Sequence, residues 1–308
     1  MNDQRPDRDQ LTVGLLNNPA VPGIIAAAPD LVEHVAVMPD RLWYDFGEGA
    51  RSGRFHKTHL TIETVREHGR TRRLVGHGIG LSLPSAIPLD EEMLTEIALL
   101  NNQFLFAWYS EHLSMFLVPH GSVPNAQAGL GLPVVYDEET FGIIRSKLRH
   151  MREVLGCPLL LETPSIFTPI PEMEMTEPEF LNRLWVEEGC GTLVDMHNLY
   201  VSWRNGGLNP RDYLEEINPD AVIEIHMAGG DELAGFYTDS HSRVTPTEVW
   251  EYVNEIVPRF HNLRGITFEF QETYFPKLGL DGIIAELERL HELASRTKTR
   301  RAAATHAV

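Results

Sequence analysis

The sequence predicts a single (β/α)8 barrel of the TIM type. Short apolar runs alternate with amphipathic stretches, which is the pattern of parallel strands joined by helices. The apolar runs number eight, the strand count of such a barrel. The 308 residues fit one barrel of about 250 residues with additional segments at its ends. An open doubly wound sheet is the alternative, but the chain lacks the GxGxxG and Walker loops that would support it.

The expected strands are nearly continuous in apolar residues, as parallel strands buried on both faces should be. They are TVGLL from Thr12, LWYDF from Leu42, RLVGHGIGLS from Arg73, FLFAWYS from Phe104, PLLLE from Pro158, GTLVDM from Gly191, AVIEIHMA from Ala221 and GITFEF from Gly265. Helical periodicity marks segments between or after them, at 138–156, 176–191, 245–260 and 281–294. Thr176 is expected to begin a helix, and Gly156 and Gly189 to end helices.

The expected domain organisation is simple. We expect residues 1–10, which are polar, to form a disordered N-terminal tail. Residues 11–294 form the barrel, and no internal repeat or linker divides them. Residues 295–308, which are basic and rich in small side chains, are expected to form a disordered C-terminal tail.

Composition narrows the function classes. The formal net charge of −18 argues against a nucleic-acid partner, which selects a basic surface. The acidity is explained by solubility or, in part, by carboxylates that bind metal ions. The two cysteines, Cys157 and Cys190, lack CxxC spacing and are expected to be buried thiols. No apolar run reaches the roughly 18 residues of a membrane span, and the first residues lack a signal-peptide core. These features favour a cytoplasmic protein.

Side chains that bind metal ions stand at the ends of six consecutive expected strands. These candidates are His77, His112, Glu162, Asp195 and His197, His226 with Asp239 and His241 in the loop that follows, and Glu269. The carboxyl ends of all strands meet at one mouth of a (β/α)8 barrel, where the active sites of this fold occur. The sequence therefore predicts a metal site at that mouth.

The residue types indicate which metals fit. Imidazole suits iron, zinc, copper and nickel, whereas carboxylates suit harder ions. A set of His, Asp and Glu without cysteine suits non-haem iron, manganese or zinc. One ion does not need all of these donors, so either several ions bind or some residues orient the ligands.

Each candidate also has a simpler explanation. A single histidine at a strand end is more often a hydrogen-bonded polar residue than a ligand, and Asp239 and His241 are also placed to cap the next helix. The coincidence over six strands favours metal binding. The other histidines fall outside the pattern, and we expect most of them on the surface. Hydrolysis of a glycoside by Glu162 and Glu269 is disfavoured by the histidines around them.

At these motifs the chain resembles the multinuclear non-haem iron-dependent oxidative enzymes, the group that includes the methanobactin-biosynthesis oxidase. The resemblance runs in order through about residues 12–292. The segments that carry it are GHGIGLSLPS from Gly76, YSEHLSMF from Tyr109, LLLETPS from Leu159, LVDMHNLYVSWRNGG from Leu193, EIHMAGG from Glu224, TDSHS from Thr238 and FEFQETYFPKLG from Phe268.

The resemblance implies a TIM-type barrel that holds two or three iron ions and uses O2 to modify residues, often cysteine, of a ribosomally made precursor peptide. It also implies a separate partner protein that presents the peptide. The positions that match metal-binding positions of the family are His77, His112, Glu162, Asp195, His226, Asp239, His241 and Glu269. His197 stands where many members have asparagine, and it remains a candidate ligand.

The chain departs from the family pattern at three places. The family's early Glu-Asn signature corresponds here to DFGEGA, which leaves Asp45 and Glu48 as doubtful ligands. Thr163 replaces a common asparagine, and FEFQE replaces a frequent Glu-Arg-Asp sequence. These changes leave open the iron count and the substrate.

Two other functions stay open at this point. One is a hydrolase or sugar isomerase of the xylose isomerase or endonuclease-four type, which would use zinc, manganese or magnesium. The other is a metal-binding scaffold without catalytic activity. An oxygen-dependent oxidoreductase acting on a peptide is the leading prediction.

Overall fold

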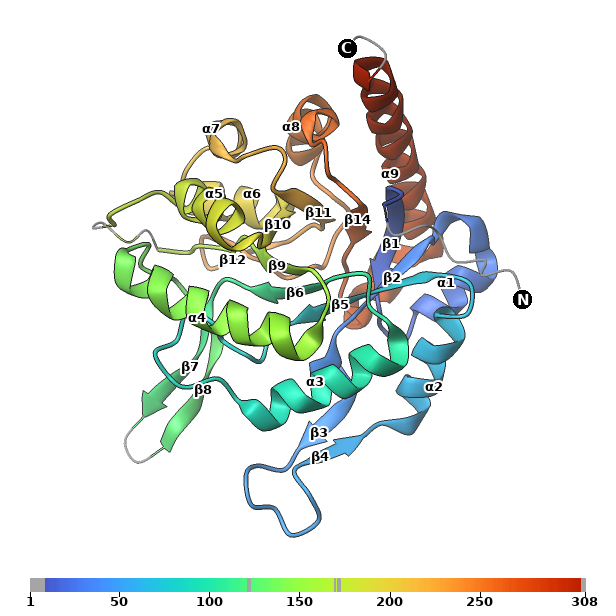
Figure 1. Cartoon of the computed structure of the whole chain (residues 1–308). Helices are drawn as coiled ribbons and strands as arrows, with labels where there is room; N and C mark the ends of the chain where they lie inside the picture. The colour runs from blue at the N-terminus through green and yellow to red at the C-terminus, as the bar shows by residue number, and fades with distance from the viewer. Residues whose placement is uncertain (1–8, 121–122, 169, 171–172, 306–308) are drawn as a thin grey trace.

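A closed barrel of parallel strands forms the centre of the molecule, as the sequence predicts (Figure 1). The computed structural model describes residues 9–120, 123–168, 170 and 173–305. The order of the strands around the barrel is β1-β14-β11-β10-β9-β6-β5-β2. Their bounds are β1 Thr12–Leu16, β2 His34–Val37, β5 Arg73–Gly78, β6 Tyr109–His112, β9 Leu159–Glu162, β10 Gly191–Asp195, β11 Val222–Met227 and β14 Gly265–Phe268.

Helices cover the outside of the barrel (Figure 1). They are α1 Val21–Ala27, α2 His59–His68, α3 Glu91–Phe104, α4 Glu138–Leu155, α5 Glu177–Glu188, α6 Met196–Arg204, α7 Pro210–Glu216, α8 Thr247–Ile256 and α9 Phe275–Thr305, with short 3-10 turns at Pro29–Leu31, Pro39–Arg41, Val257–Arg259 and Glu272–Tyr274. The three predicted helix ends are confirmed. Thr176 forms a capping box at the start of α5, and Gly156 and Gly189 end α4 and α5 with φ of +64° and +61°.

The strands bury both faces, and their side chains alternate between two environments. Residues such as Val13, Leu15 and Ile225 belong to the main core between strands and helices. Residues of the opposite parity, such as Val75 and Leu160, form a separate apolar cluster. The same alternation directs one set of polar side chains into the barrel mouth.

The second predicted strand is wrong. Barrel strand β2 is His34–Val37, whereas the predicted segment contains β3 (Trp43–Asp45), which pairs antiparallel with β4 (Phe55–Lys57) outside the barrel. The segment HVAV begins with a histidine, so it does not stand out as an apolar run in the sequence. That imidazole is buried because Thr12 and Thr267 satisfy both of its nitrogens, at 3.0 and 2.9 Å.

The fourth predicted strand begins too early. Helix α3 continues through Phe104, and Leu105 then turns the chain with φ of +57°. Asn101 accepts a hydrogen bond from the backbone nitrogen of Phe106 and so fixes this turn. Phe104 and Phe106 are buried in the main core without being part of the barrel sheet.

In the part of the chain that the structure describes, three antiparallel hairpins extend the barrel. The pair β3–β4 follows β2, β7 (Met115–His120) pairs with β8 (Val123–Leu132) after β6, and β12 (Glu232–Leu233) pairs with β13 (Phe236–Tyr237) after β11. Each follows the carboxyl end of a barrel strand, so each belongs to the mouth side. Figure 1 shows β3–β4 and β7–β8 extending from the body of the molecule.

The chain ends differ from the expectation in part. Helix α9 runs on to Thr305, so most of the segment from residue 295 is helical, and Thr297 on it is fully buried. Arg301 donates to the carbonyl oxygens of Phe260 and Leu263, which ties this part of α9 to the barrel. Most of the N-terminal segment 1–10 lies outside the described residues. In the described part of the chain, no helix is long and apolar enough to cross a membrane.

A buried carboxyl group joins three outer elements. Tyr136 and Tyr213 each donate a hydrogen bond of 2.6 Å to Glu177 at the start of α5. Burial raises the pKa of Glu177 to about 7, although the two hydroxyl donors oppose the rise. The native state therefore binds a proton more tightly than the unfolded chain does.

The stability of the protein should depend on pH through Glu177. Since the native pKa is raised, this group favours folding at low pH, and that contribution is lost as the pH rises from about 4.5 to about 7. The loss is about 3 kcal/mol at most. Urea unfolding at several pH values should show it. In Glu177→Gln this part of the pH dependence should disappear, and an unchanged profile would contradict the assignment.

Candidate metal centre

Strand register brings the candidate residues of the barrel strands together. His112 pairs with Glu162 across β6 and β9, and Asp195 pairs with His226 across β10 and β11. Residues two apart on a strand face the same side, so Glu269 lies on the same face as Thr267, the β14 partner of His226. These side chains consequently converge at one end of the barrel interior.

The remaining candidates come from two other elements. His197 is the second residue of α6, and Asp239 and His241 lie in the loop between β13 and α8. His197 Nδ1 is 3.2 Å from Asp239 Oδ1, and His241 Nε2 is 2.9 Å from the same oxygen. This trio adjoins the strand-borne residues, because His241 Nδ1 is 3.5 Å from Glu269 Oε2.

All nine candidates form one connected cluster. Five overlapping groups of three have potential ligand atoms within 4.8 Å of one another. The groups are His77/His226/Glu269, His77/His112/Glu162, His197/Asp239/His241, Glu162/Asp195/His226 and Asp195/His241/Glu269. The overlap means that single carboxylates serve more than one group.

Two glutamates face histidines with both oxygens. Glu162 Oε2 lies 3.1 Å from His112 Nε2 and 3.6 Å from His77 Nε2, while its Oε1 lies 3.5 Å from His226 Nδ1. Glu269 Oε1 lies 3.0 Å from His226 Nδ1, and its Oε2 faces the imidazole of His241. A carboxylate in such a position can bridge two metal ions.

Unsatisfied polar atoms gather in the cluster. Buried polar groups normally have hydrogen-bond partners, so a local concentration of exceptions calls for a missing ligand. Within the described residues, buried side-chain atoms that lack a hydrogen bond include Glu162 Oε2, Asp195 Oδ2, His197 Nε2, His226 Nδ1 and Nε2, His241 Nε2 and Glu269 Oε1. The residues present therefore fit a bound cation.

Neighbouring groups orient two of the candidate imidazoles. Ser110 donates to the carbonyl of Gly76, which leaves its oxygen to accept from His77 Nδ1 at 2.9 Å. His112 Nδ1 donates to the carbonyl of Gly78 at 2.9 Å. Both imidazoles are thereby left with Nε2 lone pairs that face Glu162. Such outer hydrogen bonds fix the tautomer of metal-binding histidines.

Asp195 has two roles. Its Oδ1 caps α6 by accepting from the backbone nitrogens of His197 and Asn198, at 2.7 and 2.8 Å, and its Oδ2 remains for another partner. The helix-cap explanation thus holds for one oxygen of Asp195. It does not hold for Asp239 or His241, because α8 begins after Pro246 without a side-chain cap.

A column of buried polar groups supports His226 from below. Its Nε2 lies 3.3 Å from Glu224 Oε1, which also accepts from Thr267 at 2.7 Å. Glu224 Oε2 accepts from Trp108 Nε1 at 2.6 Å, and Thr267 continues the column to His34. Neither Glu224 nor His34 was predicted from the sequence. Their signal is polar residues of interior parity within otherwise apolar strands.

Burial controls the charge of several cluster residues. It lowers the pKa of His77 to about 4 and also lowers that of His197. It raises the pKa of Asp195 to about 8, and the charge of Glu162 adds to this rise. These groups favour their neutral forms in the protein alone.

The pKa of two other histidines is raised instead. Burial by itself would lower the pKa of His226, but the surrounding carboxylates, Glu269 foremost, raise it well above its ordinary value. Burial is likewise outweighed at His241, whose pKa Asp239 and Glu269 raise to about 10. The buried carboxylates thus require positive charge, and a metal ion would replace these protons.

Two carboxylates near the mouth were also missed. Asp40, which follows β2, accepts from the backbone nitrogen of Ile79 at 3.3 Å. Glu111 has the opposite strand parity to His112 and accepts from Tyr109 and from the nitrogen of Leu81. The sequence predicted the second strand from Leu42, so Asp40, which follows the actual β2, was not predicted.

The doubtful candidates Asp45 and Glu48 lie away from the cluster. Asp45 belongs to the β3–β4 hairpin and pairs with Arg54 at 2.9 Å, and Glu48 follows it in the same hairpin. Neither is in a group of potential ligands among the described residues. The two cysteines, Cys157 and Cys190, are buried as predicted.

The fold and the cluster define a TIM-type barrel with histidines and carboxylates gathered at its mouth. The family model described as "RiPP precursor modification enzyme MbnB/TglH/ChrH" matches residues 25–295. The chain belongs to this family, whose members modify ribosomally made precursor peptides. The family resemblance found in the sequence is confirmed.

Relatives of similar length support the assignment. A UPF0276 protein of Chromobacterium violaceum is 32% identical over 247 residues, covering 80% of this chain and 86% of the relative. A UPF0276 protein of Anaeromyxobacter sp. is 32% identical over 257 residues, covering 83% and 87%. Their names state no activity.

Solved structures share the fold at low identity. A D-allulose 3-epimerase from Methylomonas sp. superposes with a TM-score of 0.56 at 11% identity, over 93% of this chain and 98% of the other. A xylose isomerase-like TIM barrel protein from Mycobacterium smegmatis in complex with magnesium gives 0.53 at 11% identity, over 96% and 99%. Such similarity establishes the barrel alone.

Gly230 should be intolerant of a side chain. A Cβ atom there would lie 1.9 Å from the carbonyl oxygen of Thr238 and 3.1 Å from His197 Nε2. We expect Gly230→Ala to lower the free energy of unfolding by about 1–3 kcal/mol. The reason is that the loop that carries Asp239 and His241 (the ligand loop) must shift to make room for the added methyl group. Urea denaturation of the metal-free protein measures this.

Gly142→Ala is the matched control, since no atom lies within 4 Å of a Cβ at that position on α4. It should be neutral or stabilise the protein by up to about 1 kcal/mol. Equal destabilisation by the two variants would show that Gly230 is not needed for close approach.

Proposed function

We propose that this protein is a multinuclear non-haem iron-dependent oxidase or oxygenase that modifies a residue, of cysteine type, in a ribosomally made precursor peptide with O2. The observation that carries the proposal is the double-sided placement of Glu162 and Glu269. Each directs its two oxygens at histidines of different groups. Family membership supplies the substrate class.

The donor set suits iron. It combines imidazoles with carboxylates and contains no thiolate, a mixture that non-haem iron accepts. Two or three ions account for the number of donors and for the shared carboxylates. One ion would be held by His77, His112 and Glu162, and another by His226 with Asp195 and Glu269. The loop trio of His197, Asp239 and His241 would hold the third.

Bound iron would supply the activation of O2 and the oxidising power, which amino-acid side chains lack. The chain's own residues provide binding and orientation. Ser110 and the carbonyl of Gly78 set the imidazoles of His77 and His112, so that Nε2 of each faces the centre. Glu224 does the same for His226 by facing its Nε2 and leaving Nδ1 toward Glu162 and Glu269.

The mouth offers an approach for a peptide. Hairpins β3–β4 and β7–β8 follow the carboxyl ends of β2 and β6 and extend beyond the barrel body (Figure 1). His112 at the end of β6 is about one-fifth exposed, with 20% of its side-chain surface accessible, whereas His226 is fully buried. We propose that the peptide reaches the centre from the His112 side and that a separate protein presents it.

Metal analysis after anaerobic purification tests the proposal. We expect two or three iron ions per chain and, after iron-57 loading, a Mössbauer signal of coupled ions. Glu162→Gln should lose at least one ion, because two groups share this carboxylate. His150→Asn is the control, since His150 lies on the surface and pairs with Glu91.

The outcome also separates the alternative function. Zinc or manganese alone, with iron unable to restore activity, would overturn the proposal in favour of a hydrolase or isomerase. Full iron content in Glu162→Gln would overturn the shared-ligand arrangement. Oxygen consumption that depends on a cysteine-containing precursor peptide would support the oxidative function.

A further inference from the structure

We infer that Asp231 is a positioning residue for the metal centre: it holds the loop that carries Asp239 and His241 and anchors this loop to α9 through Lys277. The inference rests on the proposed function, because it treats Asp239 and His241 as metal ligands. Asp231 itself lies outside the groups of potential ligands among the described residues.

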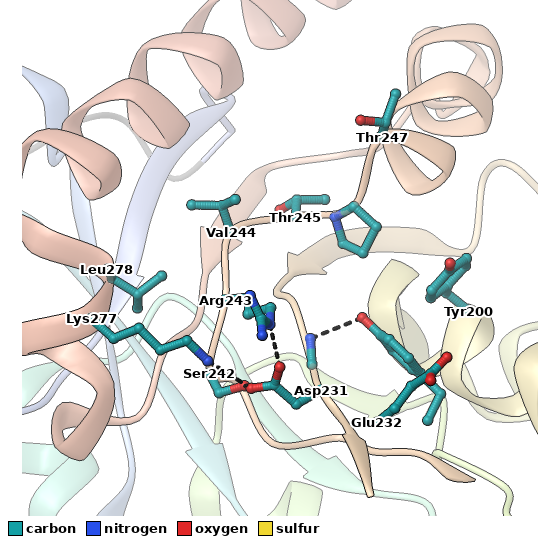
Figure 2. Close-up of a pocket in the computed structure, with 13 residues that line it drawn as sticks. Tyr200, Asp231, Glu232, Ser242, Arg243, Val244, Thr245, Thr247, Lys277 and Leu278 are labelled. Carbon is teal, nitrogen blue, oxygen red and sulfur yellow. Dashed lines mark hydrogen bonds and ion pairs between the residues drawn. The ribbon is translucent and has the colours of Figure 1, made fainter. Parts of the chain in front are cut away.

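The side chain of Asp231 fixes the far end of the ligand loop. Its Oδ2 accepts from Ser242 Oγ at 2.6 Å and from Lys277 Nζ at 2.8 Å, and its Oδ1 accepts from Arg243 Nε. Figure 2 shows Ser242, Arg243 and Lys277 converging on this one carboxylate. Ser242 and Arg243 directly follow His241 in the sequence.

The backbone of Asp231 fixes the near end. Its carbonyl oxygen accepts from the nitrogen and the hydroxyl of Thr238, at 2.9 and 2.7 Å. Its nitrogen lies 3.2 Å from Ser240 Oγ and donates to it. Asp231 therefore contacts residues before, between and after the two ligands.

The ligand loop needs such support because no barrel strand runs through it. His241 adopts a left-handed backbone with φ of +48°, which costs a residue with a side chain about 1–2 kcal/mol. The segment from Ser242 onward also lines an open pocket. A cavity of about 730 Å³ lies there, lined by Asp231, Ser242 and Lys277 among others (Figure 2). Backbone hydrogen bonds from Ser242 and Arg243 to the carbonyl of Gly229 also hold the loop, and the side chain of Asp231 adds to them beside this space.

The third member of the trio is linked to the same turn. Gly230 precedes Asp231 and donates its backbone N–H to Tyr237 Oη at 3.0 Å. The ring of Tyr237 packs edge-on against His197, with centroids 5.7 Å apart. A shift of the turn would thus reach all three residues of the loop site.

The contacts are placed to organise the loop more than to stabilise the whole fold. The side chains of Arg243 and Lys277 are 56% and 44% exposed, and ion pairs this exposed contribute little to global stability. Removing the charge of Asp231 should consequently move the ligand loop without unfolding the barrel.

The test compares Asp231→Asn with Glu232→Gln. Glu232 is the next residue and pairs with Arg204, so its variant also loses an exposed ion pair on the same turn. Metal-free protein is titrated anaerobically with Fe(II), and bound ions are counted at each concentration. Asp231→Asn should weaken binding of one ion by about 10–100-fold and leave the others unchanged, whereas Glu232→Gln should match the wild type. Both should melt within a few degrees of the wild type.

Lys277→Met provides a second variant that leaves Asp231 in place and removes only the link to α9. We expect it to weaken the same ion by a smaller factor than Asp231→Asn. Equal Fe(II) binding by the wild type, Asp231→Asn and Glu232→Gln would overturn the inference.

Hydrogen exchange of the metal-free protein separates failure of this inference from failure of the proposed function. Amides of residues 238–243 should exchange faster in Asp231→Asn than in Glu232→Gln. Because the protein is metal-free, this result does not depend on which metal the wild type binds. If the wild type binds no iron but this difference is seen, the loop-holding role stands and the proposed iron function fails. If the exchange rates are equal, the inference about Asp231 fails.

Discussion

The crowding of buried carboxylates at the barrel mouth is the constraint on which the rest of the structure depends. Glu162, Asp195 and Glu269 are each at most 2% exposed. Keeping Glu162 and Glu269 charged away from water costs several kcal/mol each unless opposite charge lies close by. In the protein alone, His226 and His241 supply that charge by keeping protons whose pKa the carboxylates raise. Under the proposed function, metal ions would supply it with more charge per site, which would account for so many donors in one small volume.

The barrel meets this constraint with two kinds of support. Strand-borne residues such as His112 and Glu162 are fixed by the parallel ladder, which sets them side by side. Below them, the column from Glu224 to Thr267 and His34 is fully hydrogen-bonded at its centre, so it gives the cluster a rigid floor. Loop-borne residues have no ladder and depend on polar contacts within their own loop and on contacts from Gln271 and from Lys277 of α9.

The barrel and the cluster could be predicted because both leave a pattern within single strands. Apolar strands report burial on both faces, and a polar residue at the end of each strand stands out against them. Strand β2 was not predicted because His34 interrupts its apolar pattern. The residues that hydrogen-bond to His34, Thr12 and Thr267, are far from it in the sequence. The role of Asp231 was not predicted for the same reason, because its partner Lys277 lies 46 residues further along the chain.

Under the proposed function, the loop that carries Asp239 and His241 would set how many ions the mouth can hold. Sugar epimerases share this barrel at 11% identity, so the fold alone does not set the chemistry. Of the five groups of potential ligands among the described residues, four contain donors from the barrel strands, and these four share the carboxylates Glu162, Asp195 and Glu269. One of these four groups also includes His241 from the loop. The group of His197, Asp239 and His241 takes nothing from the barrel strands. A third ion would therefore depend on the geometry of this loop, and under the proposed function a chain that lost the loop's order would retain a smaller metal centre in an intact barrel.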